Sequence, residues 1–294
     1  MKIAVLGPVT KDYIKIDGKL TVQIGGIPYY IALALKNLGV KDVVSYITYG
    51  QADEKFIVKN FQGLKIEHIS AKHTLESYLE YSISNPDERK VKITYHSNII
   101  KPKNKLIKEL SKFDYVILGP LFHDNIPFDL FFKLKNKNLV YGNFGIFTYI
   151  EKGKFVRKNP ENLIKVLPYL KYLFLDDKEA KFVSGKKTIK EMAKFFRKNG
   201  LNNLIITQGS RGSHIFIGRK YYSIPAFAPK KIIDTTGAGD TYLAAFIRAI
   251  ELFNNPLEWG RFAAMVATIS LEKKGAFSSN LNNTLKRLKQ LNKL

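Results

Sequence analysis

The stretch Asp234-Thr235-Thr236-Gly237-Ala238-Gly239-Asp240 decides how the rest of this chain is interpreted. It lies between a strand-like run at residues 231–233 and a long apolar-periodic segment that predicts a helix from Thr241 onward. Because two glycines flank a small alanine, the main-chain N–H groups of residues 237–240 can converge on an anion. The start of a helix adds N–H groups without acceptors and about half a positive charge. The stretch therefore predicts a phosphate-binding turn.

Asp240 distinguishes this stretch from a simple phosphate-binding turn. A carboxylate repels an anion, and one chemical reason for its presence is a hydroxyl group that loses its proton while it attacks phosphorus. The stretch then predicts a kinase for a small alcohol, in which Asp240 is the general base. The main-chain amides of Gly237, Ala238, Gly239 and Asp240 would form the anion hole. We expect the helix N-terminus to lower the pKa of Asp240. The alternative is a glycine-rich turn in which Asp240 only favours the helix start.

The same string resembles the C-terminal signature of the PfkB/ribokinase family of carbohydrate and nucleoside kinases. The resemblance implies an α/β fold, a ribokinase-like three-layer α/β/α sandwich with a mainly parallel central sheet and a small β-sheet lid. It also implies a single kinase domain over residues 1–294, with ATP as phosphoryl donor and Mg²⁺ bound mainly by the nucleotide phosphates.

Composition excludes several classes of protein. Of the 294 residues 45% are apolar and none is cysteine, so the chain has a globular core but no disulfide and no thiolate metal site. No apolar run reaches membrane-spanning length, and we expect a cytoplasmic protein without a membrane partner. The net charge of +23 comes from lysines spread along the whole chain, which favours a solvated surface over a dedicated nucleic-acid site. The positive field should still attract an anionic nucleotide.

The N-terminal region carries candidate substrate-binding residues. Residues 2–6 predict a buried strand, and Asp12 follows its carboxyl end, the edge at which ligands bind in parallel sheets. A carboxylate there can accept hydrogen bonds from two neighbouring hydroxyl groups, although a solvated turn aspartate is the alternative. Gly25 and Gly26 then open a helix with a core-facing apolar stripe, and paired glycines allow a ligand to approach the backbone.

The segment from Gly25-Gly26 to Gly39 resembles the N-terminal signature of the family. Ribokinases carry a lysine and an asparagine where Ile27 and Tyr30 stand here, which argues against ribose, and the segment is more similar to archaeal inositol kinases. The resemblance implies that Asp12, Gly25, Gly26 and Tyr30 bind substrate. Asn143 is a further candidate, in a stretch that keeps a glycine of the inositol-kinase pattern and lacks its acid and arginine.

Two separate regions predict a small second sheet. Residues 12–24 contain the hairpin signal Asp17-Gly18, and two alternating runs within residues 75–98 are joined by a turn at 85–88. In the family such a sheet is a lid over the sugar site and often a dimer contact, so a homodimer through the lid is compatible with the sequence. The alternative is that these are edge strands of one large sheet.

The second half of the chain alternates between strand and helix patterns. The strand candidates are residues 114–118, 138–141, 172–175, 203–207 and 213–217. Helical patterns such as residues 189–198 lie between them, which predicts a mainly parallel sheet with helices on both faces.

Three further segments are candidates for binding the nucleotide and its metal ion. Asp176 and Glu179 occupy the place of the family's Asn-x-x-Glu and could hold Mg²⁺ through water, although an acidic helix start is the alternative. Residues 207–212 resemble the family's Thr-x-Gly-x-x-Gly nucleotide loop, and the alanines of residues 261–267 would let an adenine lie against a helix. The resemblance assigns nucleotide contacts to Thr207, Gly209, Gly212, Thr236 and Ala264.

Together these features predict an ATP-dependent kinase for a hydroxyl group of a small sugar or polyol, with a myo-inositol-like substrate as the leading hypothesis. A nucleoside, ribose, a fructose phosphate or a ketodeoxy sugar acid remains open as acceptor, as does a heterocyclic vitamin alcohol. A different class also remains open, a non-catalytic regulator that binds a sugar or a nucleotide.

Overall fold

The computed structural model describes residues 1–61, 63–82, 85–94, 98–142 and 145–291. A nine-stranded sheet forms the centre, in the order β15-β14-β13-β12-β9-β8-β1-β4-β5. The strands are β1 (Lys2–Pro8), β4 (Asp42–Gly50), β5 (Lys65–Ala71), β8 (Tyr115–Leu118), β9 (Asn138–Gly142), β12 (Leu170–Asp176), β13 (Asn203–Thr207), β14 (Ser213–Ile217) and β15 (Lys220–Ile224). Neighbouring strands pair in parallel except at β14 and β15.

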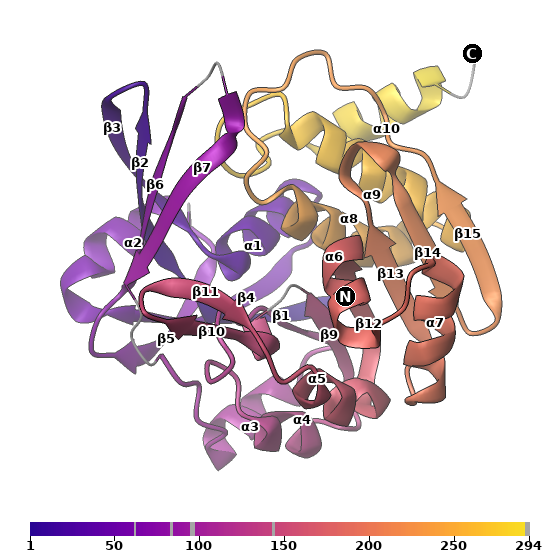
Figure 1. Cartoon of the computed structure of the whole chain (residues 1–294), viewed down its shortest axis with the longest axis horizontal. Coiled ribbons are helices and arrows are strands. Elements are labelled where there is room, and N and C mark those ends of the chain that lie inside the picture. The colour runs from indigo at the N-terminus through magenta and orange to yellow at the C-terminus, as the bar shows by residue number, and fades with distance from the viewer. Residues whose placement is uncertain (62, 83–84, 95–97, 143–144, 292–294) are drawn as a thin grey trace.

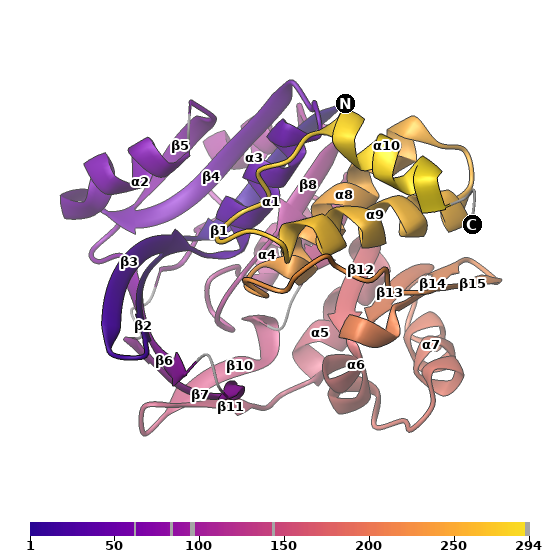
Figure 2. The ribbon, with the colours of Figure 1, turned by 90° about the horizontal axis from the view of Figure 1, so that it is seen from above.

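Helices cover both faces of this sheet, as Figure 2 shows. One face carries α1 (Ile27–Asn37), α2 (Glu54–Asn60), α8 (Ala238–Leu252), α9 (Pro256–Ser270) and α10 (Leu281–Leu291). The other carries α3 (Asn104–Leu110), α4 (Phe128–Lys133), α5 (Glu161–Val166), α6 (Asp177–Ser184) and α7 (Ile189–Lys198). Strand β1 contributes to both cores, because Ile3 and Val5 face the first set of helices whereas Ala4 and Leu6 face the second. The predicted three-layer α/β/α sandwich is therefore confirmed.

A second sheet stands apart from the first, in the order β3-β2-β6-β7. Its strands are β2 (Thr10–Ile16), β3 (Lys19–Gly25), β6 (Leu75–Ser82) and β7 (Asn85–Thr94), and β2 joins the two hairpins by pairing in parallel with β6. Figure 1 shows it rising from one end of the large sheet. The two predicted regions thus form a separate sheet, and the alternative of edge strands in one large sheet is wrong.

Some local predictions differ from the structure. Residues 231–233 form a loop instead of a strand, in which Ile232 and Ile233 are 62% and 52% exposed. Helix α8 begins at Ala238, earlier than the predicted Thr241. A hairpin of β10 (Thr148–Glu151) and β11 (Lys154–Arg157) was not expected. Its turn uses Lys152 and Gly153, both at positive φ, and lysine is not a residue that signals such a turn.

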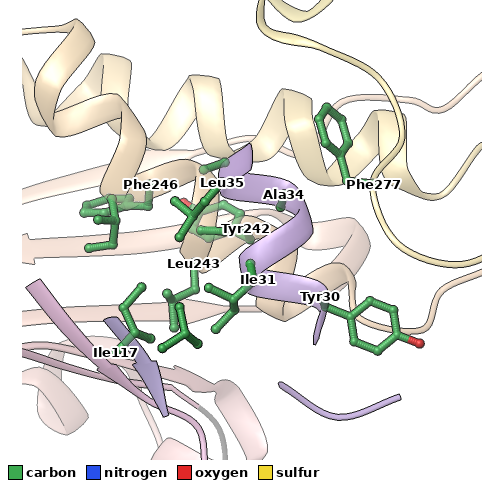
Figure 3. Close-up of a cluster of buried hydrophobic side chains, with 14 of the residues drawn as sticks. Tyr30, Ile31, Ala34, Leu35, Ile117, Tyr242, Leu243, Phe246 and Phe277 are labelled. Atoms are coloured by element: carbon green, nitrogen blue, oxygen red, sulfur yellow. The ribbon is translucent and has the colours of Figure 1, made fainter. Parts of the chain in front are cut away.

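The packing of α1 on α8 brings the two signature segments together. Figure 3 shows Ile31 and Leu35 of α1 beside Tyr242 and Leu243 of α8, whereas Tyr30 points away from this cluster. These apolar side chains are buried in one core. None of the helices formed by the described residues is long and apolar enough to cross a bilayer.

Candidate active site

The turn before α8 depends on glycine at position 237. Gly237 precedes the first residue of the helix in a left-handed conformation with φ 71°, and a Cβ atom there would lie 2.3 Å from the Tyr30 ring. A side chain is therefore excluded by the backbone conformation and by the space. A Cβ at Gly239 would meet no atom within 4 Å, so the backbone remains open on that side. The first N–H groups of α8 have no acceptor within the helix, although the Ala238 N–H makes a long hydrogen bond of 3.4 Å to the Thr235 carbonyl oxygen. Such N–H groups at a helix N-terminus can bind an anion.

Asp234 fixes the shape of this turn. One carboxylate oxygen accepts a hydrogen bond from the Thr236 amide at 2.9 Å, and the other accepts one from the Gly275 amide at 3.0 Å. The amides of Ile233 and Asp234 both donate to the Leu271 carbonyl oxygen. The turn is thus tied to the segment that follows α9, and Asp234 acts as a positioning residue that the sequence alone did not reveal.

A cavity of about 250 Å³ lies beside the start of α8. It collects several predicted site residues, because β9, β12 and β13 end there with Gly142, Asp176 and Thr207. Its described lining residues are Gly142, Arg157, Phe174, Leu175, Asp176, Glu179, Thr207, Gly239, Asp240 and Leu243. The cavity is therefore at the carboxyl edge of the sheet, where ligands bind in folds of this kind.

The carboxyl group of Asp240 has a pKa of about 7, raised by burial. The expectation that the helix N-terminus lowers this pKa is wrong, because the loss of hydration opposes the charged form more strongly than the helix dipole favours it. A carboxylate with a pKa near neutrality is a better proton acceptor than an ordinary aspartate. The structure therefore strengthens the case for Asp240 as a base.

Asp176 and Glu179 form the start of α6. The Asp176 carboxylate accepts the Glu179 amide at 2.7 Å, and the Glu179 carboxylate accepts the Asp176 amide at 2.9 Å. This is a capping box, as the alternative interpretation of an acidic helix start expects. Burial and the charge of Asp176 raise the pKa of Glu179 to about 8, although Arg157 acts in the opposite direction.

Mg²⁺ would have few protein ligands at this site. In the part of the chain that the structure describes, no cluster of three or more His, Cys, Asp or Glu side chains could hold a metal ion. Asp176 and Glu179 each use one oxygen in the capping box. This donor set fits an ion that is bound mainly by water and phosphate oxygens, with a carboxylate as the protein contribution.

Asp12 and the paired glycines form a compact group at the base of the second sheet. Asp12 lies within β2, is only 6% exposed and accepts a hydrogen bond from the Ser77 hydroxyl at 2.5 Å. The alternative of a solvated turn aspartate is therefore wrong, and burial raises the pKa of Asp12. A Cβ at Gly25 would lie 2.0 Å from the Asp12 carboxylate. Gly26, at φ 97°, is equally restricted, because a Cβ would lie 2.7 Å from the Pro8 carbonyl oxygen.

Tyr30 connects this group to the anion-binding turn. Its ring covers Gly237, and its buried phenol oxygen has no hydrogen-bond partner among the described residues. Burial, together with the charges of Asp12, Asp234 and Asp240, raises its pKa. A buried hydroxyl group without a partner is unfavourable, which makes this oxygen a candidate for a ligand contact. Asp12, Gly25, Gly26 and Tyr30 lie outside the lining of the 250 Å³ cavity.

The proposed nucleotide residues are only partly brought together. Thr207 lines the cavity, and Gly209 and Gly212 follow it in a tight turn at φ 57° and 92°. A Cβ at Gly212 would lie 2.1 Å from the Ile224 carbonyl oxygen, so this position requires glycine. Ala264 is buried in the core of α9.

Three further residues complete the description of the candidate site. Arg211, which belongs to the predicted nucleotide loop at residues 207–212, forms an ion pair with Asp177. Asn143 lies outside the described residues. Arg157 lines the cavity, and the sequence did not predict it as a site residue. The sequence around it carries no motif that relates the β10–β11 hairpin to the glycine-rich segments at residues 25–39 and 234–240.

Comparison with known proteins agrees with this geometry. The model of the pfkB family carbohydrate kinases matches residues 2–283. The nucleoside kinase of Methanocaldococcus jannaschii is 29% identical over 162 residues, which is 55% of this chain and 52% of that protein. Fructosamine kinase FrlD of Bacillus subtilis is 25% identical over 284 residues, or 94% of this chain and 93% of that kinase.

A solved structure has the same fold over nearly the whole chain. It is a pyrophosphate-dependent kinase in the ribokinase family, complexed with a pyrophosphate analogue and myo-inositol. The TM-score is 0.79 at 23% identity, and the match covers 97% of this chain and 99% of that one. The chain spans about half of the M. jannaschii relative, and less than a third of several other curated relatives, so these matches are confined to part of each protein.

Proposed function

The chain belongs to the pfkB family of carbohydrate kinases, and from this premise we propose that it is an ATP-dependent kinase for a hydroxyl group of a small sugar or polyol. One observation carries the proposal. The Asp240 carboxyl group, with a pKa of about 7, lines a cavity at the N-terminus of α8, beside an open backbone at Gly239. A base and an anion-binding turn at one place are the two groups that alcohol phosphorylation needs.

In this mechanism the acceptor hydroxyl group donates a hydrogen bond to Asp240. The hydroxyl oxygen attacks the terminal phosphorus of the donor in line with the leaving oxygen, and Asp240 takes the proton as the new O–P bond forms. The N–H groups of Gly237, Ala238, Gly239 and Asp240 stabilise the charge on the phosphoryl oxygens. Bound Mg²⁺, with Asp176 and Glu179 as the nearby carboxylates, would neutralise part of the phosphate charge.

The acceptor site is proposed to consist of Asp12, Gly25, Gly26 and Tyr30. The buried carboxylate of Asp12 and the phenol of Tyr30, which has no hydrogen-bond partner among the described residues, are suited to the adjacent hydroxyl groups of a polyol. Glycine at position 25 leaves room for the Asp12 carboxylate itself. A myo-inositol-like acceptor is the leading proposal, and the solved relative that binds myo-inositol supports it. Relatives named as a nucleoside kinase, a ribokinase and a 1-phosphofructokinase keep a nucleoside, ribose and a fructose phosphate as alternatives.

The remaining parts of the proposal concern the nucleotide and the second sheet. We propose nucleotide contacts at Thr207, Gly209, Gly212, Thr236 and Ala264, and a lid function for the four-stranded sheet. Leu20, Val22 and Tyr78 of that sheet are exposed, which supports a homodimer through it. As a nucleotide-dependent enzyme it would act in the cytoplasm.

An ADP-release screen over polyols, sugars, sugar phosphates and nucleosides tests the function, with wild type and Asp240→Asn in parallel. We expect acceptor-dependent ADP release, and a kcat at least about 100-fold lower for Asp240→Asn. The control is Asp129→Asn on α4, which changes an exposed acid paired with Lys133 and should leave kcat unchanged. ATP binding without turnover by wild type would favour the non-catalytic regulator instead. Near-normal turnover by Asp240→Asn would remove this residue from the mechanism.

A further inference from the structure

The cavity beside Asp240 has an unusual charge balance for a site that receives phosphate. Among its described lining residues are three acids, Asp176, Glu179 and Asp240, and a single cationic residue, Arg157. A phosphoryl group is itself negative, and none of the three carboxyl groups attracts it electrostatically. The guanidinium group of Arg157 is therefore the side chain in this lining that can favour the phosphoryl group.

The hairpin β10–β11 delivers Arg157 to the cavity. Arg157 is the last residue of β11 and pairs with Thr148, which is buried. Phe155 lies on the same face of the strand and stacks on Phe122 with ring centroids 6.2 Å apart. The Lys158 amide donates to the Phe147 carbonyl oxygen at 3.0 Å. The backbone that carries Arg157 is thus anchored to the body of the protein, and Figures 1 and 2 show the hairpin next to the four-stranded sheet.

The ion pair between Arg157 and Glu179 is long. The Nη2 atom of Arg157 lies 3.8 Å from Oε1 of Glu179, beyond hydrogen-bond distance, and the Arg157 side chain is 36% exposed. Oε2 of Glu179 accepts the Asp176 amide in the capping box at 2.9 Å, so this carboxyl group is fixed at the start of α6. A phosphoryl group offers the guanidinium group of Arg157 several charged acceptors, in a geometry that suits its two parallel N–H groups.

We propose that Arg157 binds the phosphoryl group during transfer, moving from Glu179 to the phosphoryl oxygens. The inference rests on the proposed kinase function and adds a catalytic residue to it. The acceptor oxygen forms the new bond to phosphorus, and the bond from phosphorus to the leaving oxygen of the donor breaks. The acceptor proton passes to Asp240, while Arg157 exchanges no proton and stabilises the charge on the equatorial oxygens.

The experiment compares Arg157→Gln, Arg157→Lys and the control Lys154→Gln, which alters an exposed cation on the same strand. We expect Arg157→Gln to lower kcat/KM for the phosphoryl donor at least about 100-fold, the effect of removing one charge-stabilising group. Arg157→Lys should recover part of this loss, and added guanidinium ion should partly rescue Arg157→Gln. The thermal midpoint and the Kd of the acceptor should match wild type for all variants.

A kcat/KM within threefold of wild type for Arg157→Gln would overturn the inference. So would a loss of activity with a lower thermal midpoint and no rescue by guanidinium, because that indicates a structural role. If wild type transfers no phosphoryl group to any acceptor, the proposed kinase function fails separately. The inference is then tested by calorimetric binding of inorganic pyrophosphate, which Arg157→Gln should weaken at least about tenfold if the guanidinium group binds phosphate. Equal binding by both proteins would overturn it.

Discussion

At the scale of single residues, Asp240 is subject to two opposing effects. The helix N-terminus favours its charged form, whereas burial in the cavity wall favours its neutral form. Burial prevails, since the pKa is about 7 instead of the usual value of 3.8. At neutral pH the residue is therefore divided between a form that can accept a proton and one that cannot, so the proposed role of Asp240 as a base should be sensitive to pH.

This gives a pH dependence with a defined sign. Only deprotonated Asp240 can accept the acceptor's proton, so kcat/KM should rise with pH through about 7 and become level above it. The measurement is kcat/KM between about pH 5 and pH 9, with the thermal midpoint recorded at each pH to exclude unfolding. The residual kcat/KM of Asp240→Asn should not show this rise with pH. An apparent pKa near that of an ordinary aspartate would contradict the role of burial.

At the scale of elements, the start of α8 is shaped by a contact with α1. The Tyr30 ring lies against Gly237, so the N-terminal signature segment determines which residue is tolerated in the C-terminal one. The packing of Ile31 and Leu35 against α8 keeps the two helices in this relation (Figure 3). The turn before α8 is therefore shaped by two segments that are distant in the sequence.

The two glycines of the turn should respond differently to alanine. Gly237→Ala introduces a Cβ at positive φ against the Tyr30 ring, and should reduce the free energy of unfolding by about 1–3 kcal/mol together with activity. Gly239→Ala is the matched control, because its Cβ meets no protein atom and alanine favours a helix.

For Gly239→Ala we expect an unchanged or higher thermal midpoint and a raised KM for the donor, because Gly239 lines the cavity that the methyl group would enter. Thermal unfolding and steady-state kinetics of both variants provide the measurement. Equal thermal midpoints for the two variants would show that the left-handed turn is not required.

At the scale of the whole molecule, the candidate site lies at the carboxyl edge of one sheet, whereas the lysines and arginines are spread along the whole chain. The net charge is +23, whereas the cavity itself is lined by more acids than bases. The positive field can therefore act mainly on the approach of an anionic donor and less on the transfer step.

Ionic strength should separate these two effects. Raising it from about 0.01 M to about 0.5 M shortens the screening length from about 30 Å to a few ångström. We expect kcat/KM for ATP to fall several-fold over this range, because its association is electrostatically assisted. The control is kcat/KM for an uncharged acceptor at saturating ATP, which should change less than about twofold. An equal fall of kcat/KM for ATP and for the uncharged acceptor would contradict electrostatic attraction of ATP, because it would indicate that salt changes the enzyme itself.

The sequence by itself determined the features that depend on neighbouring residues. Periodicity along the chain indicated a mainly parallel sheet with helices on both faces, and the hairpin signals indicated two pairs of strands, because side-chain direction along an element follows from local geometry. Only packing decided that these pairs join in a sheet of their own, since edge strands of the large sheet fitted the same signals. The glycines before Asp240 indicated the turn, whereas the start of α8 at Ala238 and the loop at residues 231–233 differ from the sequence prediction.

Only the tertiary structure decided the features that depend on burial and on distant contacts. The pKa of Asp240 is set by the depth of the cavity, and the requirement for glycine at position 237 comes in part from Tyr30. Arg157 reaches the cavity on a hairpin whose Lys152-Gly153 turn gave no signal. Desolvation and proximity arise only when the chain is packed, so no local pattern contains them.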